Sequence, residues 1–294
     1  MTRGERRVLW VGLAFISPWI IGFLTFTVYP LAAALYYSFC DYDILSNPVW
    51  VGTLNYRDLV ADHVFWRSLY NTLRYATFFL PLGMLLSLLV AILLTQSIKG
   101  RSVFRLTYFL PCLVPVVASA MIWLWMFNSR FGLLNRALAK MGIDGPNWLT
   151  DPHWAMPSLI LMSLWGIGNM IVIYLATLHD VPKHIYESTD MDGASFGRKL
   201  WHITVPMISP VIYFNLIMGL IGSLQVFVQP YIMVPDGGIN RSALFYTVYL
   251  YEHAFSYLNM GYASAMACIL FLLIFFLTWM ATCSIQKRIY YAGE

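Results

Sequence analysis

The sequence predicts an all-α, polytopic membrane protein with six transmembrane helices. Of its 294 residues, 60% are hydrophobic and 11% are charged, and the mean hydropathy is +0.67. Soluble domains contain roughly 45–50% apolar and about 25% charged residues, so these totals exclude a water-soluble globule. Six charge-free stretches of 24–33 residues are each long enough to cross the hydrocarbon core, which takes about 20 residues. The cationic residues between the stretches predict how the chain is oriented.

The six stretches differ in length, and the longest are expected to be irregular. They are Val8–Cys40, Tyr75–Ile98, Leu106–Ser129, Trp154–Leu178, Ile203–Pro235 and Ala254–Gln286. Three have 24 or 25 residues and fit a helix with modest tilt, but the other three have 33 residues. A straight helix of that length would be about 50 Å long. We expect these three to leave the bilayer or to break, with kinks or ends at Pro18 and Pro30 in the first and at Pro206, Pro210 and Pro230 in the fifth.

The first stretch has some features of a cleaved signal peptide. Arg3, Arg6 and Arg7 precede it, and Ala32–Ala34 resembles a cleavage site. The apolar region of a signal peptide is about 7–15 residues long, and this stretch is much longer. We therefore expect an uncleaved first transmembrane helix.

The count of basic residues on alternate sides of the spans predicts the orientation. One side carries eleven, namely Arg3, Arg6, Arg7, Lys99, Arg101, Arg105, Lys183, Arg198, Lys199, Lys287 and Arg288. The other carries six, namely Arg57, Arg67, Arg130, Arg136, Lys140 and Arg241, and Arg74 lies at the outer mouth of the second span. Because the cytoplasmic side is the more basic one, we expect a multi-pass protein of the cell membrane with both termini in the cytoplasm.

The spans lack the residues that would drive transport or catalysis. No span interior contains Asp, Glu, Lys, Arg or His, which disfavours a secondary transporter that relays protons, although sodium coupling through backbone carbonyls stays open. The sequence has no Gly-Lys dipeptide and therefore no P-loop for ATP. Cys40, Cys112, Cys268 and Cys283 are scattered, and neither they nor the six histidines have metal-ligand spacing. We expect no catalysis, cofactor or metal, and an integral membrane enzyme is the second reading.

The longest cytoplasmic segment lies between the fourth and fifth spans. Pro182 suits the first turn of a helix, and Gly193 permits a turn that other residues resist. A second short helix is expected from Ser195 to Trp201. The segment would then be a helix–turn–helix under the membrane with an apolar ridge, and composition alone leaves open that it is an ordinary amphipathic connector.

The spacing in this segment resembles the EAA motif of ABC-transporter permease subunits. The motif is Glu-Ala-Ala, three residues, Gly, nine residues, Ile, one residue and Leu-Pro. This chain has Glu187, Ser188, Thr189, Gly193, Ile203, Val205 and Pro206 at the same intervals, with Ser188 and Thr189 in place of the alanines and Val205 in place of leucine. In that family the loop docks into a cleft of the cytoplasmic ATPase subunit. The resemblance therefore implies that Glu187, Ser188, Thr189, Gly193, Ile203 and Pro206 couple the chain to an ATPase.

Flanking segments extend the resemblance over nearly the whole chain. They include 51–56, 65–72, 109–111, 132–135, 249–251 and 260–265, whereas Asp236-Gly237-Gly238-Ile239 departs from the usual Gly-Gly-Pro. The chain is similar to the permeases of binding-protein-dependent sugar importers of the maltose and glycerol-3-phosphate type. This implies an ABC-importer permease (MetI-like) fold that forms half of a carbohydrate translocation pathway. The expected partners are a second permease subunit in a heterodimer, two cytoplasmic ATP-binding subunits, an extracytoplasmic substrate-binding protein, the sugar and the lipid bilayer.

The same resemblance implies a domain organisation. Residues 1–70 would form the cytoplasmic N-terminus, the first helix and an outer loop. Residues 71–286 would form a five-helix permease core with the coupling loop 179–206, followed by a cytoplasmic tail, 287–294. The outer loops 41–74 and 130–153 are too short for a separate substrate-binding domain, so that function is expected on another chain.

Neutral polar residues in the fourth and fifth spans are the candidates for the sugar path, because sugar hydroxyls need hydrogen-bond partners and aromatic faces. They are Ser163, Asn169, Asn215, Ser223, Gln225 and Gln229, with Trp165 and Phe227 nearby. The position of the cavity in maltose-type relatives favours Asn169, Ser223, Gln225 and Gln229. Hydrogen bonding between helices remains the alternative for each of them.

Overall fold

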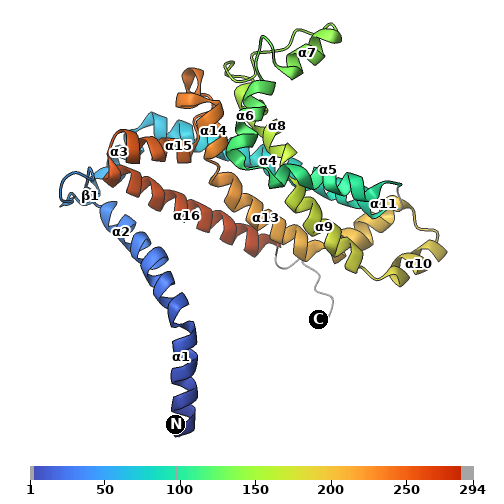
Figure 1. Cartoon of the computed structure of the whole chain (residues 1–294), viewed down its shortest axis with the longest axis horizontal. Helices are drawn as coiled ribbons and strands as arrows, with labels where there is room; N and C mark the ends of the chain where they lie inside the picture. Colours follow the sequence, from blue (N-terminus) through green and yellow to red (C-terminus); the bar gives the residue numbers. More distant parts are fainter. Residues whose placement is uncertain (1–2, 97–98, 286–294) are drawn as a thin grey trace. The chain divides into compact units, whose positions relative to one another are not determined.

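The computed structural model describes residues 3–96 and 99–285, which are mostly helical (Figure 1). They divide into two compact units. One consists of the described residues up to Asp62 together with Leu250–Leu272, and the other of His63–Tyr249 together with the described residues from Leu273 onward.

The first unit contains the lead helix and a small outer cap. Its elements are α1 (Arg3–Phe23), the π-helix η1 (Leu24–Val28), α2 (Tyr29–Tyr37), β1 (Cys40–Asp41), β2 (Val49–Trp50), α3 (Leu54–Ala61), the π-helix η5 (Glu252–Ser256) and the first part of α16 (Met260–Ile285). The two strands pair antiparallel, with Cys40 opposite Trp50 and Asp41 opposite Val49. The Asn55 amide donates to the carbonyls of Ser38 and Cys40 at 3.0 and 2.9 Å. These bonds fasten the end of the lead helix to α3.

The second unit contains the remaining elements. They are α4 (His63–Thr95), α5 (Arg101–Leu113), α6 (Val116–Met126), α7 (Leu133–Lys140), α8 (Ala155–Trp165), α9 (Gly168–Asp180), α10 (Lys183–Met191), α11 (Phe196–Lys199), the π-helix η2 (Leu200–Thr204), α12 (Val205–Met207), α13 (Ser209–Leu224), α14 (Val228–Met233), the 3₁₀-helices η3 (Pro235–Gly237) and η4 (Ile239–Arg241), the part of α15 (Tyr246–Tyr251) up to Tyr249, and the last part of α16. Helix α4 packs along α9 and α13 (Figure 1).

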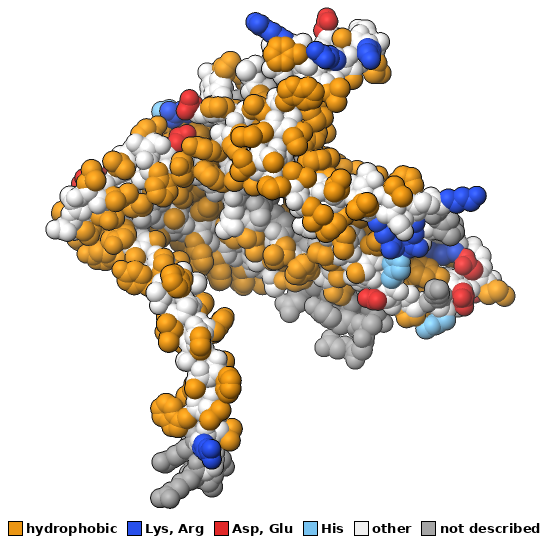
Figure 2. All heavy atoms as spheres, in the orientation of Figure 1, with side chains coloured by type: hydrophobic (Ala, Val, Ile, Leu, Met, Phe, Trp, Pro, Cys, Tyr) orange, Lys and Arg blue, Asp and Glu red, His pale blue; other side chains and the backbone are white. Residues whose placement is uncertain are grey.

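Four described helical segments are long and apolar enough to cross a membrane, namely Trp10–Tyr37, His63–Thr95, Ser209–Met233 and Met260–Ile285. Two bent pairs, α5 with α6 and α8 with α9, raise the number to six if each pair is one span. Exposed hydrophobic side chains cover most of the face seen in Figure 2, which is the surface that a protein in lipid presents. The chain is therefore an all-α, multi-pass membrane protein.

Several expected helix ends were wrong. Helix α4 begins at His63, twelve residues before the charge-free stretch, and so carries Arg67 and Arg74. The sixth span begins at Met260, because η5 occupies the residues before it. The fifth span begins at Ser209, next to Pro210, which confirms the end expected near Pro206 and Pro210. The lead helix continues through Pro18, and a π-turn accommodates Pro30, which has no N–H to bond the carbonyl one turn earlier.

The break in the fifth span was expected from its length and from Pro230, whereas the bends in the third and fourth spans were not. The third span turns by 102° between α5 and α6, because Val114 precedes Pro115 and is extended (φ −76°, ψ 127°). The fourth bends by 44° at Gly166 and Ile167. The fifth is interrupted between α13 and α14, close to Pro230. Pro230 has no N–H for the Val226 carbonyl, and the Thr247 hydroxyl donates to that carbonyl instead.

A hydrophobic core at one end of the second unit joins α4, α9 and α13. Its buried members are Ala91, Leu94, Ile171, Tyr174, Leu175, Val181 and Ile208. Val181 and Ile208 are the residues through which the chain enters and leaves the segment that contains α10, α11 and η2. That segment is therefore attached to the spans at both of its ends.

Candidate functional site

Two features of the second unit bear on function, and the first is a cavity of about 700 Å³. It lies where the third, fourth and fifth spans are interrupted, because Val114, Gly166 and Val226 are all among its lining residues. Where a membrane helix is interrupted, backbone groups lose the hydrogen-bond partners that a continuous helix would give them. Transporters bind their substrates at such sites.

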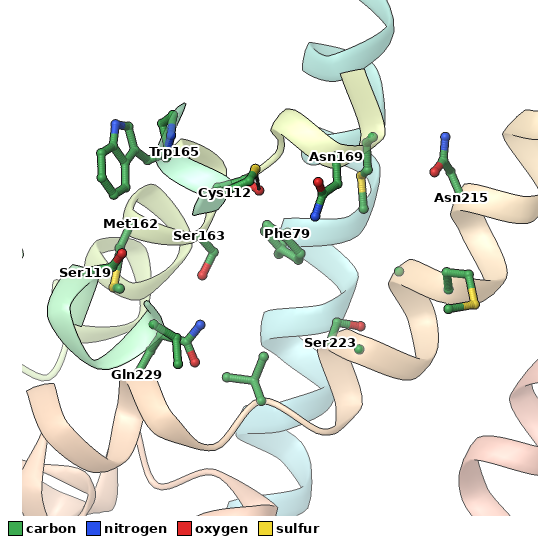
Figure 3. Close-up of a pocket in the computed structure, with 18 of the residues that line it drawn as sticks. Phe79, Cys112, Ser119, Met162, Ser163, Trp165, Asn169, Asn215, Ser223 and Gln229 are labelled. Atoms are coloured by element: carbon green, nitrogen blue, oxygen red, sulfur yellow. Dashed lines mark hydrogen bonds between the residues drawn. The ribbon is translucent and has the colours of Figure 1, made fainter. Parts of the chain in front are cut away.

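The lining of the cavity is neutral and rich in hydrogen-bonding groups. None of its 23 lining residues is Asp, Glu, Lys, Arg or His. The polar members come from α6, α8, α9, α13 and α14, namely Ser119, Ser163, Asn169, Asn215, Ser223 and Gln229, and the aromatic members are Tyr75, Phe79, Trp165 and Phe214. Figure 3 shows the side chains of Ser163, Asn169, Ser223 and Gln229 around one space. Such a lining suits a polyhydroxylated guest.

The structure brings three of the four residues expected on the sugar path together. Asn169, Ser223 and Gln229 line the cavity, whereas Gln225 does not. Gln225 is the C-terminal cap of α13 and is exposed, because the interruption of the fifth span turns the backbone there (φ −108°, ψ 12°).

The cavity also has lining residues that the sequence analysis did not favour. Ser163 and Asn215 were named there only as polar residues of the spans, and Tyr75 and Ser119 were not named as candidates. Asn215 is only 2% exposed, and its Nδ2 atom has no hydrogen-bond partner among the described residues. Tyr75 donates to the Ser163 hydroxyl at 2.7 Å, across 88 residues of sequence. Ser119 comes from α6, whose bend away from α5 the sequence did not predict. The one signal available was that Ser163 and Asn215 are polar residues within apolar spans.

The second feature is the loop 179–206, whose turn has the conformation expected for its glycine. Gly193 has φ +68°. Its N–H donates to the Asp190 carbonyl at 3.1 Å, and the N–H of Ala194 donates to the Thr189 carbonyl at 3.1 Å. This pair of bonds is a Schellman motif, which ends α10 and favours glycine because its left-handed backbone strains other residues.

The two hydroxyl residues in the motif behave like the small residues they replace. The Ser188 hydroxyl donates to the His184 and Ile185 carbonyls at 2.9 and 3.1 Å. The Thr189 hydroxyl donates to the Ile185 and Tyr186 carbonyls at 3.1 and 2.9 Å. Both side chains therefore satisfy their polarity within α10, while Glu187 on the same helix is exposed.

Two further contacts tie α10 to the second half of the loop. The hydroxyls of Tyr186 and Thr204 are 2.9 Å apart, and Lys199 forms an ion pair with Asp190. Ile203 lies half-buried in η2 and Pro206 in α12. Tyr186 and Thr204 had not been expected as site residues, although the opposite charges of Asp190 and Lys199 on the two sides of the Gly193 turn were visible in the sequence.

The loop and the cavity are connected by two helices. Helix α9 runs from Asn169 in the cavity wall to the start of the loop, and α13 runs from the end of the loop back to Ser223 in the cavity wall. Both helices contribute to the hydrophobic core that holds the ends of the loop. No cluster of three or more His, Cys, Asp or Glu able to hold a metal ion occurs within residues 3–96 and 99–285.

Comparison with known proteins agrees with this arrangement. The model of the family described as "binding-protein-dependent transport system inner membrane component" matches residues 82–289. The probable ABC transporter permease protein YesP of Bacillus subtilis is 37% identical over 94% of this chain and 91% of its own length. The arabinooligosaccharides transport system permease protein AraP of the same species is 32% identical over 88% of this chain and 83% of its own length.

The fold is that of a known transporter. A crystal structure of a bacterial ABC transporter involved in the import of the acidic polysaccharide alginate superposes with a TM-score of 0.83, at 23% identity, over 97% of this chain and 98% of the other. Members of the matching family are transport components, and ATP hydrolysis belongs to a separate subunit. With its interrupted spans, neutral cavity and capped loop, this chain belongs to the family of inner-membrane permease components of binding-protein-dependent ABC transport systems.

Proposed function

We propose that the chain forms half of the pathway by which a carbohydrate is imported, with the cavity as the path and the loop 179–206 as the link to an ATPase. The observation that carries this is the neutral cavity at the interruption of three spans. Amide and hydroxyl groups beside aromatic rings match a sugar, which offers hydroxyl groups and apolar ring faces. The arabinooligosaccharide transporter among the relatives supports the same class of substrate.

The partners follow from what this chain lacks. We propose a heterodimer with a second permease, which closes the cavity and supplies the other half of the path. Two cytoplasmic ATP-binding subunits supply the energy, because the sequence has no P-loop. An extracytoplasmic binding protein delivers the sugar.

The coupling loop acts as a rigid insert in the ATPase subunit. Met191, Phe196 and Trp201 are 89, 63 and 68% exposed, so the loop presents apolar side chains for burial in a cleft. Glu187 is exposed beside them and supplies a charge-assisted hydrogen bond or an ion pair within that cleft. Ser188, Thr189 and Gly193 shape the first half of the loop, and Ile203 and Pro206 join it to α13.

The proposed orientation places the loop and both termini in the cytoplasm. Ser195 and Asn47 are both exposed. A cysteine introduced at Ser195 should react only with reagents that reach the cytoplasm, and a cysteine at Asn47 only with external reagents. Reaction of both positions from one side would contradict the six-span topology.

The native Cys112 gives a direct test of the path. Its side chain lines the cavity and lies 3.2 Å from the Gly166 carbonyl. In a variant that keeps Cys112 as its only cysteine, a small hydrophilic thiol reagent should label the reconstituted complex at a rate that changes between the resting and the vanadate-trapped states. Radiolabelled oligosaccharide uptake, measured in the same vesicles, should require ATP and the binding protein. Uptake driven by an ion gradient without the ATPase would instead indicate a secondary transporter.

A further inference from the structure

Two arginine side chains converge on one histidine at the end of the second unit that carries the coupling loop. Arg101 and Arg105 are four residues apart in α5, so they lie on the same face of the helix. Their Nη2 atoms lie 2.7 and 3.3 Å from Nε2 of His179 in the last turn of α9. Figure 2 shows cationic side chains gathered with a histidine at this end.

The histidine does not neutralise the two cations. Its Nδ1 atom lies 2.6 Å from the Leu175 carbonyl. With the hydrogen on Nδ1 donated to that carbonyl, Nε2 is an uncharged acceptor for both guanidinium groups. Two like charges one helical turn apart repel each other, and this arrangement therefore calls for an anion.

No acidic side chain among the described residues supplies that anion. The ion pair found at this end joins Lys199 to Asp190 and does not include Arg101 or Arg105. The Nε atoms of both arginines are enclosed and have no hydrogen-bond partner within the described part of the chain. The pair therefore retains unused donors as well as uncompensated charge.

An apolar groove leads away from the arginines along α5 and α9. It has a volume of about 430 Å³, and Arg105 is the one charged residue among the nine that line it. The rest of its wall includes Leu94, Leu106, Phe109, Ile171 and Leu175. Gly168 also lines the groove, where a Cβ would overlap the Tyr108 carbonyl, so α5 and α9 are in close contact there.

We propose that this groove binds one anionic phospholipid of the leaflet that faces the ATPase subunits. The phosphate accepts hydrogen bonds from Arg101 and Arg105, and an acyl chain lies in the groove. The match is one of both charge and polarity. Arg105 lines the groove, Arg101 shares His179 with it, and two guanidinium groups suit a phosphate, while the hydrocarbon wall suits a lipid tail. A soluble anion would use the arginines but would leave the apolar wall unoccupied. The bound lipid would hold α5 against α9 next to the coupling loop.

The test uses the complete complex, purified and exchanged into nanodiscs of equal parts phosphatidylglycerol and phosphatidylcholine. Native mass spectrometry then counts the phosphatidylglycerol molecules that remain after delipidation. Wild type should retain phosphatidylglycerol in preference to phosphatidylcholine, and the double variant Arg101→Gln with Arg105→Gln should lower that retention by about tenfold. The matched control is Arg198→Gln, which removes an exposed cation of α11 that does not line the groove and should leave retention unchanged.

A second variant separates the tail from the headgroup and remains informative if the double variant does not assemble. Leu106→Ser keeps both cations but makes an exposed part of the groove polar, and it too should lower retention. Equal retention in wild type and the arginine variant would overturn the proposal. So would displacement of the lipid by inorganic phosphate, which would show a site for a free anion, or a cross-link from Arg105 to an acidic residue of a partner subunit in the lipid-bound complex.

Discussion

The coupling loop and the cavity lie in the same unit but differ in how their hydrogen-bonding groups are paired. In the loop, hydrogen-bonding groups are paired locally. The Schellman motif closes α10, the Ser188 and Thr189 hydroxyls return to the backbone, and Tyr186 with Asp190 reaches across to Thr204 and Lys199. In the cavity, three spans are interrupted, and the polar side chains of Asn169, Ser223 and Gln229 face an open space. The hydrogen bonds of the loop therefore hold it in one shape, whereas polar side chains of the cavity face a space that a bound molecule can fill.

On the proposed function, this difference lets one chain carry both a force and a substrate. Val181 and Ile208 fix the two ends of the loop in the core formed by α4, α9 and α13, so a displacement of the loop would reach α9 and α13 as a rigid motion. Both helices end at the cavity, where the breaks in the helices allow the walls to rearrange. The substitutions below test each half of this contrast.

The largest effect is expected for Gly193→Val. A Cβ at this position meets no atom within 4 Å, so the penalty is conformational, about 1–3 kcal/mol for a β-branched residue at φ +68°. Sugar uptake by the reconstituted complex should fall by about tenfold or more, with either lower ATPase association or ATP hydrolysis that no longer responds to substrate. The amount of permease in the membrane should not change.

Two controls make this result specific. Gly193→Asn should retain most activity, because asparagine tolerates the left-handed region. Gly197→Val is the second control, because a side chain at Gly197 also has free space but Gly197 does not have a positive φ. Normal uptake and normal substrate-stimulated ATPase activity in both Gly193→Val and Glu187→Ala would reduce the loop to an ordinary connector.

A smaller effect is expected for Thr247→Val, which removes the hydroxyl that replaces the missing bond of Pro230. The Val226 carbonyl would lose this partner at a cost of about 1–2 kcal/mol, and α14 with Gln229 would lose its fixed position. Thermal unfolding of the complex should occur at a lower temperature and uptake should fall several-fold. Thr77→Val is the matched control, because the Thr77 hydroxyl bonds only to the Leu73 carbonyl of its own helix.

In the cavity, Asn169→Ala and Gln229→Ala should each reduce the rate of uptake at low sugar concentration by about fivefold, since one hydrogen bond contributes about 1 kcal/mol. Gln225→Ala should have little effect, because Gln225 is exposed and does not line the cavity. Binding of the ATPase subunit should be normal in all three variants. A larger loss in Gln225→Ala than in the other two would place the path elsewhere or on the partner permease.

The smallest effect is expected for Tyr186→Phe, which removes one hydroxyl from the loop. This hydrogen bond to Thr204 lies outside the spans and is expected to contribute about 0.5 kcal/mol. The number of sugars transported per ATP should fall by roughly two- to threefold. Thr204→Val should give the same loss, and the double variant should be no worse than either single variant. Additive losses would show that the two hydroxyls act independently.

Reasoning from the sequence predicted the turn at Gly193 in the loop 179–206, because that information is local. The interval from Glu187 to Pro206 and the need for glycine at a left-handed turn depend on neighbouring residues. The contacts of Tyr186 with Thr204 and of Lys199 with Asp190 were not predicted, because each forms only once the turn has brought the two halves of the loop together. In the cavity, polarity within apolar spans pointed to Asn169, Ser223 and Gln229 but also to Gln225, because composition does not say on which side of a break a residue lies.

The sequence by itself determined that the chain is helical and that it spans a membrane several times. Both conclusions depend on sums over many residues, and such totals do not depend on packing. Only the tertiary structure decided which side chains meet at the breaks in the spans. The contact of α5 with α9 at Gly168 and the bond from Thr247 to the Val226 carbonyl join segments that are separated in the sequence. A backbone group freed by a break needs a partner inside the bilayer, and only the folded arrangement determines which residue provides it.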